Sequence, residues 1–179
     1  MKDWGEISEA FEEINQRALA KHLDNKSEAQ TRFDIIDRLI KEVLQWEHGQ
    51  ISVEPHTTGV GDYRIIIEAK RKGAAFPSQT RRKRLKLTGT ILGNGEIKEA
   101  LEQAEDYAIN KEADIVMVTN GSCWCFYPLI DEDKNNIYAT LLFPFDQVAD
   151  AELLFNLFQV SNVENDSLKS ISIENDIII

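Results

Sequence analysis

Residues 63–70 read Tyr-Arg-Ile-Ile-Ile-Glu-Ala-Lys, and this stretch decides the fold. Three consecutive isoleucines are typical of a strand that is covered on both of its faces. Side chains alternate along a strand, so Glu68 and Lys70 project from one face and Ala69 from the other. We therefore predict a central strand over 63–69 that ends with an acid and a base side by side.

On both sides of this strand, the hydrophobic pattern predicts further elements. Apolar residues at helical spacing predict helices over 6–23, 28–45, 96–111 and 146–159, the second of them opened by a capping box at Ser27 and Gln30. Apolar runs predict strands over 50–54, 113–119, 123–128 and 137–143. Residues 56–61, HTTGVG, indicate a turn, and 71–95 a long loop with a short strand around 85–91. Helices alternating with buried strands imply an α/β fold, a mixed β-sheet flanked by α-helices.

The bulk composition fits one domain. The chain has 179 residues, of which 42% are hydrophobic and 28% charged, as in ordinary globular proteins. No stretch reaches the ~18 apolar residues of a membrane span, and the acidic N-terminus lacks the apolar core of a secretory signal. Two cysteines leave no disulfide framework to propose. We expect a cytoplasmic protein with a single domain over 1–160 (core about 27–128) and, over 161–179, a polar tail or the start of a linker to a missing C-terminal part.

The charge distribution is uneven. A net charge of −11 argues against nucleic-acid binding, which normally needs a basic surface. Between Arg64 and Lys86, however, there are nine basic residues and one acid, Glu68. On charge alone, a solvated loop and a phosphate-binding loop are equally good interpretations. The position of the run, directly after the predicted strand, favours nucleic-acid binding by Arg71, Lys72, Arg81, Arg82, Lys83, Arg84 and Lys86.

The acids around the strand suggest phosphodiester chemistry. Cleavage of a phosphodiester needs a hard cation that activates water and stabilises negative charge. Magnesium is held by one or two carboxylates together with waters and phosphate oxygens. Asp62, before the strand, and Glu68, at its end, are candidate ligands, and Lys70 would meet the same phosphate or water. The alternative is an exposed Glu-x-Lys ion pair, which is common.

Four segments resemble the PD-(D/E)XK nuclease superfamily: GDY over 61–63, IIIEAKR over 65–71, QAEDY over 103–107 and VTNG over 118–121. The likeness is to the N-terminal cleavage domain of type I restriction enzyme R subunits and to related anti-phage defence proteins, and it spans about residues 27–128. It implies a restriction-endonuclease-like fold and a Mg²⁺- or Mn²⁺-dependent endodeoxyribonuclease. It also implies DNA as substrate and an attached or separate helicase or ATPase as partner.

The resemblance implies roles residue by residue. In these nucleases the aspartate and glutamate bind the metal, the lysine assists water activation, and a helix acid joins the metal shell. Those roles would pass to Asp62, Glu68, Lys70 and Glu28. Gln103 and Tyr107 match a Q-x-x-x-Y element of one branch, and at i,i+4 spacing they share a helix face, where they would hold a phosphate or orient Lys70.

One feature departs from the family pattern. Only five residues separate Asp62 from Glu68, and in a continuous strand these residues would lie roughly 20 Å apart, too far to share one ion. We therefore expect a bend at about 62–64. Without a bend, Glu54 on the preceding predicted strand is the substitute acid, or the domain is a non-cutting relative that binds nucleic acid or a partner and regulates an attached ATPase. Cys123 and Cys125, with three histidines elsewhere, do not form a zinc pattern.

Overall fold

The computed structural model describes residues 3–19, 25–47, 56–60, 63–78, 81–93, 95–129, 137–165 and 167–168, with only the backbone for 56–60 and 63. In chain order its elements are α1 (Trp4–Ala18), α2 (Glu28–Thr31), η2 (Arg32–Ile36), η3 (Leu39–Val43), β1 (His56–Val60), β2 (Tyr63–Ala69), β3 (Lys83–Lys86), α3 (Gly95–Asn110), β4 (Ile115–Thr119), β5 (Trp124–Pro128), β6 (Tyr138–Leu142), α4 (Val148–Phe158) and α5 (Val160–Glu164).

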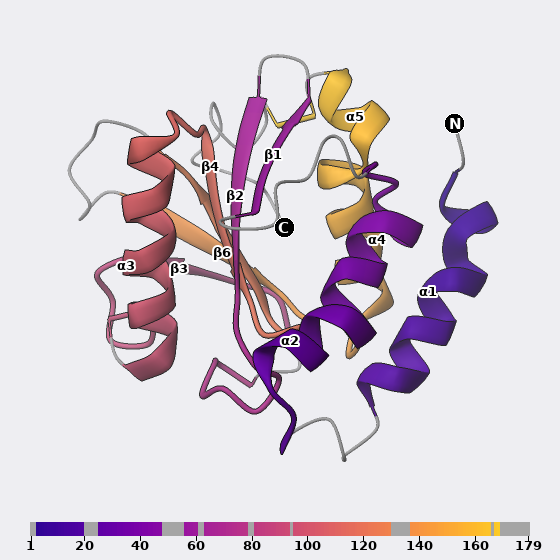
Figure 1. Cartoon of the computed structure of the whole chain (residues 1–179), viewed down its shortest axis with the longest axis horizontal. Coiled ribbons are helices and arrows are strands. Elements are labelled where there is room, and N and C mark those ends of the chain that lie inside the picture. Colours follow the sequence, from indigo (N-terminus) through magenta and orange to yellow (C-terminus); the bar gives the residue numbers. More distant parts are fainter. Residues whose placement is uncertain are drawn as a thin grey trace.

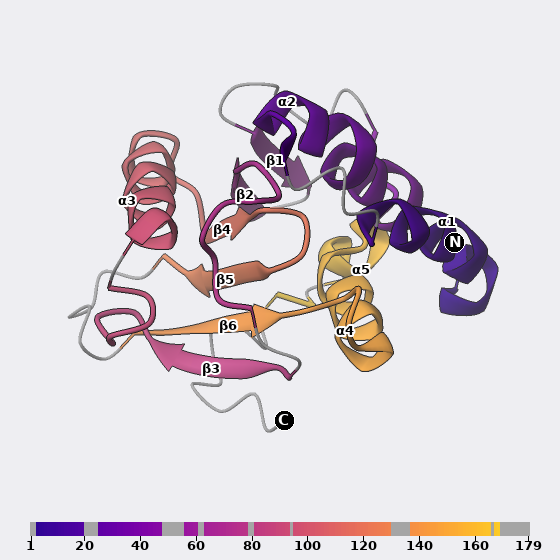
Figure 2. The ribbon, with the colours of Figure 1, turned by 90° about the horizontal axis from the view of Figure 1, so that it is seen from below.

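The strands form one mixed sheet in the order β1-β2-β4-β5-β6-β3 (Figures 1 and 2). β2 and β4 are parallel, with Ile65 opposite Ile115 and Glu68 opposite Val118. The other neighbouring strands are antiparallel. β2, β4 and β6 therefore end at the same edge of the sheet, which we call the carboxyl edge. The predicted mixed sheet flanked by helices is confirmed.

Both faces of β2 are buried at Ile65–Ile67, as the isoleucine run predicted. Ile65, Ile67 and Ala69 pack with residues of α1, η2, η3, α4 and α5, whereas Ile66 packs with residues of α3 on the other face. Figure 2 shows α3 on one side of the sheet and the remaining helices on the other. In β5 the buried side chains of Trp124 and Phe126 pack in the same cluster as Ile65, Ile67 and Ala69.

Several element boundaries differ from the prediction. Residues 56–60 form β1 and not a turn, because Thr57, Thr58 and Val60 suit a strand and pair with β2. β3 begins two residues before the predicted strand and ends before the turn at Thr88–Gly89. α5 was not predicted from the sequence. The predicted strand 50–54 lies outside the described residues.

The second predicted helix is present but not uniformly α-helical. Ser27 caps it by accepting a hydrogen bond from the backbone N–H of Gln30 at 3.3 Å. The Gln30 side chain donates to Asp34 at 2.6 Å, so the predicted capping box is only half formed. η2 and η3 have π-helical hydrogen bonding, a form that side-chain periodicity does not distinguish from the α-helix. Among the residues that the structure describes, every helix is too short or too polar to cross a bilayer.

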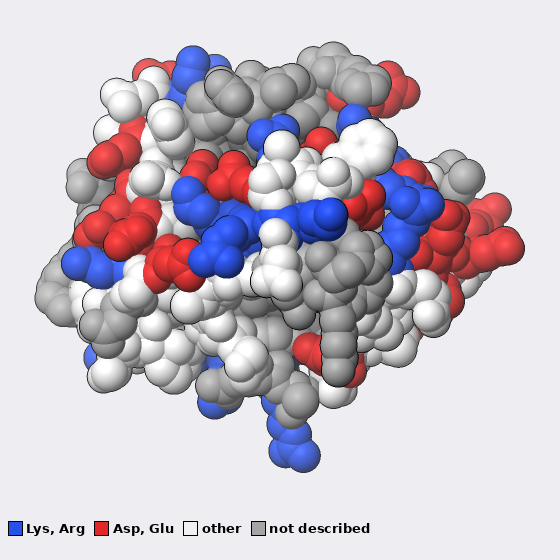
Figure 3. Space-filling model, turned by 60° about the horizontal axis from the view of Figure 1, so that its bottom comes forward, with Lys and Arg blue, Asp and Glu red and all other residues white. Residues whose placement is uncertain are grey.

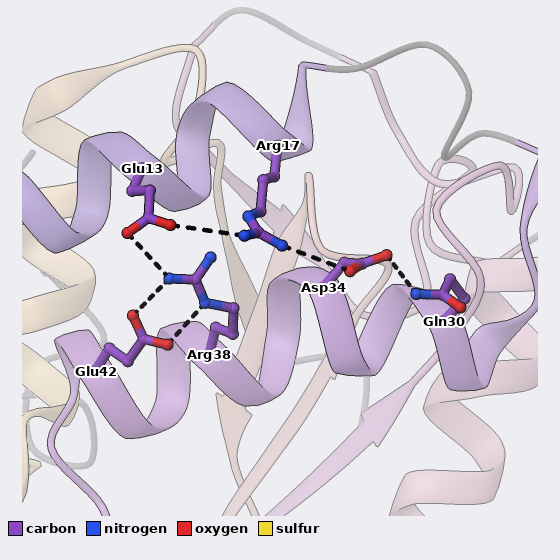
Figure 4. Close-up of polar contacts among 6 residues, drawn as sticks. All are labelled: Glu13, Arg17, Gln30, Asp34, Arg38 and Glu42. Carbon is purple, nitrogen blue, oxygen red and sulfur yellow. Dashed lines mark hydrogen bonds and ion pairs between the residues drawn. The ribbon is translucent and has the colours of Figure 1, made fainter.

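A polar network joins α1 to the helix that begins at Glu28 (Figure 4). Arg38 donates from Nε and Nη2 to the Glu42 carboxylate at 2.7 and 2.8 Å, and its Nη2 lies 3.3 Å from Glu13 on α1. Arg17 of α1 lies farther from its partners, 3.6 Å from Glu13 and 3.9 Å from Asp34. Because Arg38 bonds within its own helix and across to α1, it is the central residue of this contact.

Arg38→Met is expected to lower the free energy of unfolding by about 1 kcal/mol at neutral pH, and Arg17→Met by less than about 0.5 kcal/mol. The pKa of Glu42 lies below its usual value because Arg38 donates to its carboxylate, an effect that desolvation opposes. The stabilisation is therefore present above the unfolded-state pKa of glutamate and is lost as the pH falls through the lower folded-state pKa. Urea denaturation at about pH 7 and pH 3 measures both effects, and equal losses for the two variants at pH 7 would contradict this assignment.

Candidate functional site

Glu68 and Lys70 lie together at the carboxyl edge, at the end of β2. The Lys70 Nζ donates to Glu68 Oε1 at 2.7 Å, and the side chains of Lys70 and Glu68 are only 22% and 17% exposed. The backbone N–H of Lys70 donates to the Thr119 carbonyl at 2.8 Å, which continues the β2–β4 pairing by one residue. The alternation of the strand thus places both charged groups on the face that α3 covers.

Gln103 of α3 completes a three-residue contact. Its Oε1 accepts a hydrogen bond from Lys70 Nζ at 2.6 Å. The helix approaches the sheet closely because the buried residues Ala100, Ala104 and Ala108 form its inner stripe. An ammonium group has three N–H donors, and Glu68 and Gln103 occupy two of them. One donor of Lys70 remains for a further acceptor, within the part of the chain that the structure describes.

The segment after Lys70 is held by side chains from three elements. The Thr31 hydroxyl accepts from the backbone N–H of Lys72 at 2.9 Å. Asn120 donates to the carbonyls of Lys72 and Ala74 at 3.2 and 3.3 Å, while its Oδ1 accepts from two backbone N–H groups after β4. Glu96, at the start of α3, accepts from the backbone of Ala75 and from Arg71. These contacts keep the first turns of α2 and α3 at the carboxyl edge (Figure 1).

Glu96 is a charged anchor for this segment. Its pKa is lowered chiefly by the hydrogen bond from the Ala75 N–H. Desolvation opposes this effect, and the positive charge of Arg71 lowers the pKa further. Neither Glu96 nor Thr31 was predicted from the sequence as a functional residue, and Asn120 entered only as part of the segment 118–121. Asn-Gly is a typical turn sequence, and Gly121 has a positive φ of 87°, but a turn motif does not reveal which carbonyls the Asn120 amide will bind.

No contact among the described residues places another candidate acid beside Glu68. Asp62 and Glu54 lie outside the described residues. Tyr63, which follows Asp62, lies at the opposite end of the continuous strand β2, five steps or about 17 Å from Glu68. Glu28 is exposed in the first turn of α2, which Thr31 ties to Lys72. Among the described residues, no group of three His, Cys, Asp or Glu side chains is placed to hold a metal ion.

Tyr107 does not take part in the contact among Glu68, Lys70 and Gln103. It lies one helical turn beyond Gln103 and is 43% exposed, and among the described residues it has no hydrogen bond with Glu68 or Lys70. The two cysteines are buried, and burial raises the pKa of the Cys123 thiol to about 12. Neither thiol is therefore an available ligand or nucleophile.

The predicted nucleic-acid-binding residues occupy different environments. Figure 3 shows Lys and Arg side chains in a band across the lower face of the molecule, with Asp and Glu on both sides. Arg71 is half-exposed and pairs with Glu96 at 3.0 Å, Lys72 is half-buried, and Arg81 is exposed. Arg82 forms an ion pair with the buried carboxylate of Asp150, with 2.9 Å between Nε and Oδ1.

The remaining three basic residues lie on β3, at the edge of the sheet. Lys83 begins this strand near the carboxyl edge and Lys86 ends it at the opposite side. Arg84 lies over the ring of Tyr138 with 4.9 Å between guanidinium carbon and ring centroid, and Lys86 approaches the same ring at 5.8 Å. Four strand spacings separate β3 from β2, or about 19 Å.

Comparisons with known proteins yield no relative: no family model matches the chain, and neither does any curated protein or solved structure. The function must therefore be inferred from the chemistry of Glu68, Lys70 and Gln103 and from their place in the sheet.

Proposed function

We propose that this chain is a divalent-metal-dependent nuclease domain that hydrolyses phosphodiester bonds of DNA. The observation that carries the proposal is the contact among Glu68, Lys70 and Gln103 at the carboxyl edge. A carboxylate and an ammonium group are held there side by side, at the end of a central strand and within reach of solvent. An ion pair with only a structural role would not require the additional amide from α3.

Each of the three side chains has a distinct part in this proposal. Lys70 presents its remaining N–H to a phosphate oxygen or to the attacking water, and so stabilises the negative charge that develops. Gln103 and Glu68 fix the direction of the ammonium group, because both accept hydrogen bonds from it. Glu68 Oε1 is used by Lys70, which leaves the second oxygen of the carboxylate for another partner.

Mg²⁺ or Mn²⁺ fits the chemistry of these donors, because hard cations take carboxylate oxygens, waters and phosphate oxygens. When bound, such an ion supplies a water of lowered pKa and neutralises phosphate charge. Glu68 would be one ligand. The second acid would come from Glu54, Asp62 or Glu28. Glu54 precedes His56 by two residues, and His56 pairs with Ile67, the neighbour of Glu68.

A restriction-endonuclease-like arrangement of the sheet belongs to the same proposal. The acid and base stand on a central strand with a parallel neighbour, β4, and α3 lies in the chain between these two strands. The first turns of α2 and α3 lie at the carboxyl edge (Figure 1), and N–H groups at helix N-termini favour phosphate. In this proposal DNA crosses the carboxyl edge along the basic band in Figure 3.

The second candidate function is a non-catalytic module that binds nucleic acid and regulates an attached ATPase. The observation that favours it is that, among the described residues, Glu68 is the one carboxylate paired with Lys70 and no group of three possible metal ligands is found. Incubation of supercoiled and linear DNA with the protein, with Mg²⁺, Mn²⁺ or EDTA, separates the two functions. The same assay is to be run on the full-length gene product with and without ATP. Metal-dependent cleavage supports the nuclease, whereas DNA binding without cleavage in every condition supports the module.

DNA binding is expected to weaken steeply with salt, because lysine and arginine displace condensed counterions from phosphates. Arg71→Ala combined with Arg81→Glu is expected to reduce affinity by at least about tenfold and to lower the salt slope by about two. Fluorescence anisotropy between about 50 and 200 mM salt measures both quantities. Lys111→Glu, just beyond the far end of α3, is the control for a charge reversal of the same size as that in Arg81→Glu. Equal affinities for the double variant and the control would place the DNA surface elsewhere.

A further inference from the structure

A pocket of about 300 Å³ lies between α3, the segment 87–93 and β5, and the proposed nuclease site does not use it. We propose that this pocket binds a small molecule that combines an apolar ring with a protonated amine. The pocket is lined by Leu87, Thr88, Leu92, Gly93, Lys98, Leu101, Glu102, Glu105 and Tyr127. Its volume is at the lower end of the range for ligand pockets in proteins.

The loop that forms one wall is tightly folded. The Gly93 N–H donates to the Gly89 carbonyl at 2.7 Å, and the Gly89 N–H donates to the Lys86 carbonyl at 2.9 Å. A Cβ atom at either glycine would lie 2.9 Å from a backbone oxygen, so neither position accepts a larger residue without a shift of the backbone. The Leu87 N–H is bonded to the Ile137 carbonyl, which ties this wall to β6. This wall of the pocket is therefore held in place by its own backbone contacts.

Tyr127 lines this pocket and carries a buried polar group without a partner among the described residues. Its side chain is 1% exposed, and its hydroxyl has no hydrogen-bond partner among the described residues. Burial, and then the charge of Glu105, raise the pKa of this phenol, so the hydroxyl stays neutral and can both donate and accept. A buried polar group without a partner costs stability, and a ligand with a hydrogen-bonding group would remove that cost.

The charges on the walls select the kind of ligand. Glu102 and Glu105 contribute two carboxylates, whereas Lys98 contributes one cation that is already paired with Glu102 at 3.4 Å. The local potential favours a cation and disfavours an anion. Leu87, Leu92 and Leu101 provide the apolar surface against which a ring would lie. A protonated amine beside Glu105 would also be able to donate to the Tyr127 oxygen.

Benzylamine, tyramine and tryptamine are the probes for this proposal, with benzyl alcohol and benzoate as neutral and anionic analogues of benzylamine. Titration followed by ¹H–¹⁵N NMR is expected to give saturable shifts around the pocket for at least one amine, with benzoate at least about tenfold weaker than benzylamine. Tyr127→Phe and Glu105→Gln are each expected to weaken the amine by about fivefold or more. Glu99→Gln, on α3 outside the pocket lining, should leave the affinity unchanged, and Thr88→Trp should block binding.

The stability of Tyr127→Phe is a second measurement that does not depend on a probe. Because the hydroxyl has no partner, its removal is expected to leave the melting temperature unchanged or to raise it by about 2–4 °C. A lower melting temperature would overturn the proposal, since the hydroxyl would then have a structural partner. The proposal would also be overturned if none of the three amines bound, or if benzoate bound as tightly as benzylamine. Unchanged amine affinity in both Tyr127→Phe and Glu105→Gln would overturn it as well.

Discussion

Glu68→Gln and Lys70→Ala are each expected to reduce DNA cleavage by two to three orders of magnitude or more while the protein remains folded. Glu68→Gln keeps the shape of the side chain and removes the charge that would hold a cation. Lys70→Ala keeps the carboxylate and removes the donor that would stabilise negative charge on the phosphate. Because both side chains reach solvent, neither change empties a core position.

The controls must separate catalysis from stability. Glu99→Gln and Lys111→Ala make the same chemical changes at exposed positions within α3 and just beyond its end, and both are expected to cut like wild type. Thermal unfolding of every variant shows whether the fold is intact. Gln103→Ala is expected to lose less activity than Lys70→Ala, because it only orients the ammonium group. Full activity in both Glu68→Gln and Lys70→Ala would place the active site elsewhere.

The same assay distinguishes the candidate second acids. Glu54→Gln is expected to impair cleavage more than Asp62→Asn. The reason is that His56, two residues after Glu54, pairs next to Glu68, whereas Tyr63, next to Asp62, lies at the other end of β2. Isothermal titration with Mn²⁺ provides a readout apart from cleavage. If Asp62→Asn alone abolished ion binding, the connection between β1 and β2 would have to bring that side chain to the carboxyl edge.

The elements predicted best from the sequence are those buried on both faces, because their apolar runs allow only one interpretation. The isoleucine run of β2 and the apolar residues of β4 and β5 gave strands within two residues of those observed, and the alanine stripe of α3 gave a helix displaced by one residue. Glu68 and Lys70 followed from strand alternation alone. The resemblance placed Gln103 and Tyr107 on one helix face, where they would hold a phosphate or orient Lys70. Gln103 does bond to Lys70 at 2.6 Å, but no contact of Tyr107 with Lys70 is found among the described residues, and the role of the pair stays a prediction.

Elements that depend on distant partners were predicted poorly. His56–Val60 contains a glycine and two threonines, a pattern compatible with a turn, and it becomes a strand because β2 offers a hydrogen-bonding edge. β3 pairs with β6, which is more than fifty residues away in the chain. The contacts of Thr31 and Asn120 with Lys72 likewise join segments over forty residues apart, and no local pattern contains them.

Asp150→Ala is expected to lower the free energy of unfolding by about 3–5 kcal/mol, the largest stability effect predicted for this chain. The Asp150 side chain is 3% exposed and accepts from Arg82 Nε and from the Phe143 N–H, each at 2.9 Å. Arg82 donates in addition to the Ala149 carbonyl at 3.0 Å. Removal of the carboxylate would leave a guanidinium group, only 19% exposed, without its counter-charge, and a backbone N–H without its acceptor.

Urea denaturation of Asp150→Ala beside Asp146→Ala measures this effect, because Asp146 is exposed in the turn before α4 and its loss should change stability by less than about 0.5 kcal/mol. Equal stabilities for the two variants would show that the buried pair is not needed. Arg82→Met is also expected to be strongly destabilising, since it leaves Asp150 buried and unpaired. Arg82 therefore stabilises the fold whether or not it contacts DNA, and a loss of binding in an Arg82 variant would not by itself identify a phosphate contact. Arg81, which is exposed beside it, tests that contact without disturbing the Asp150 pair.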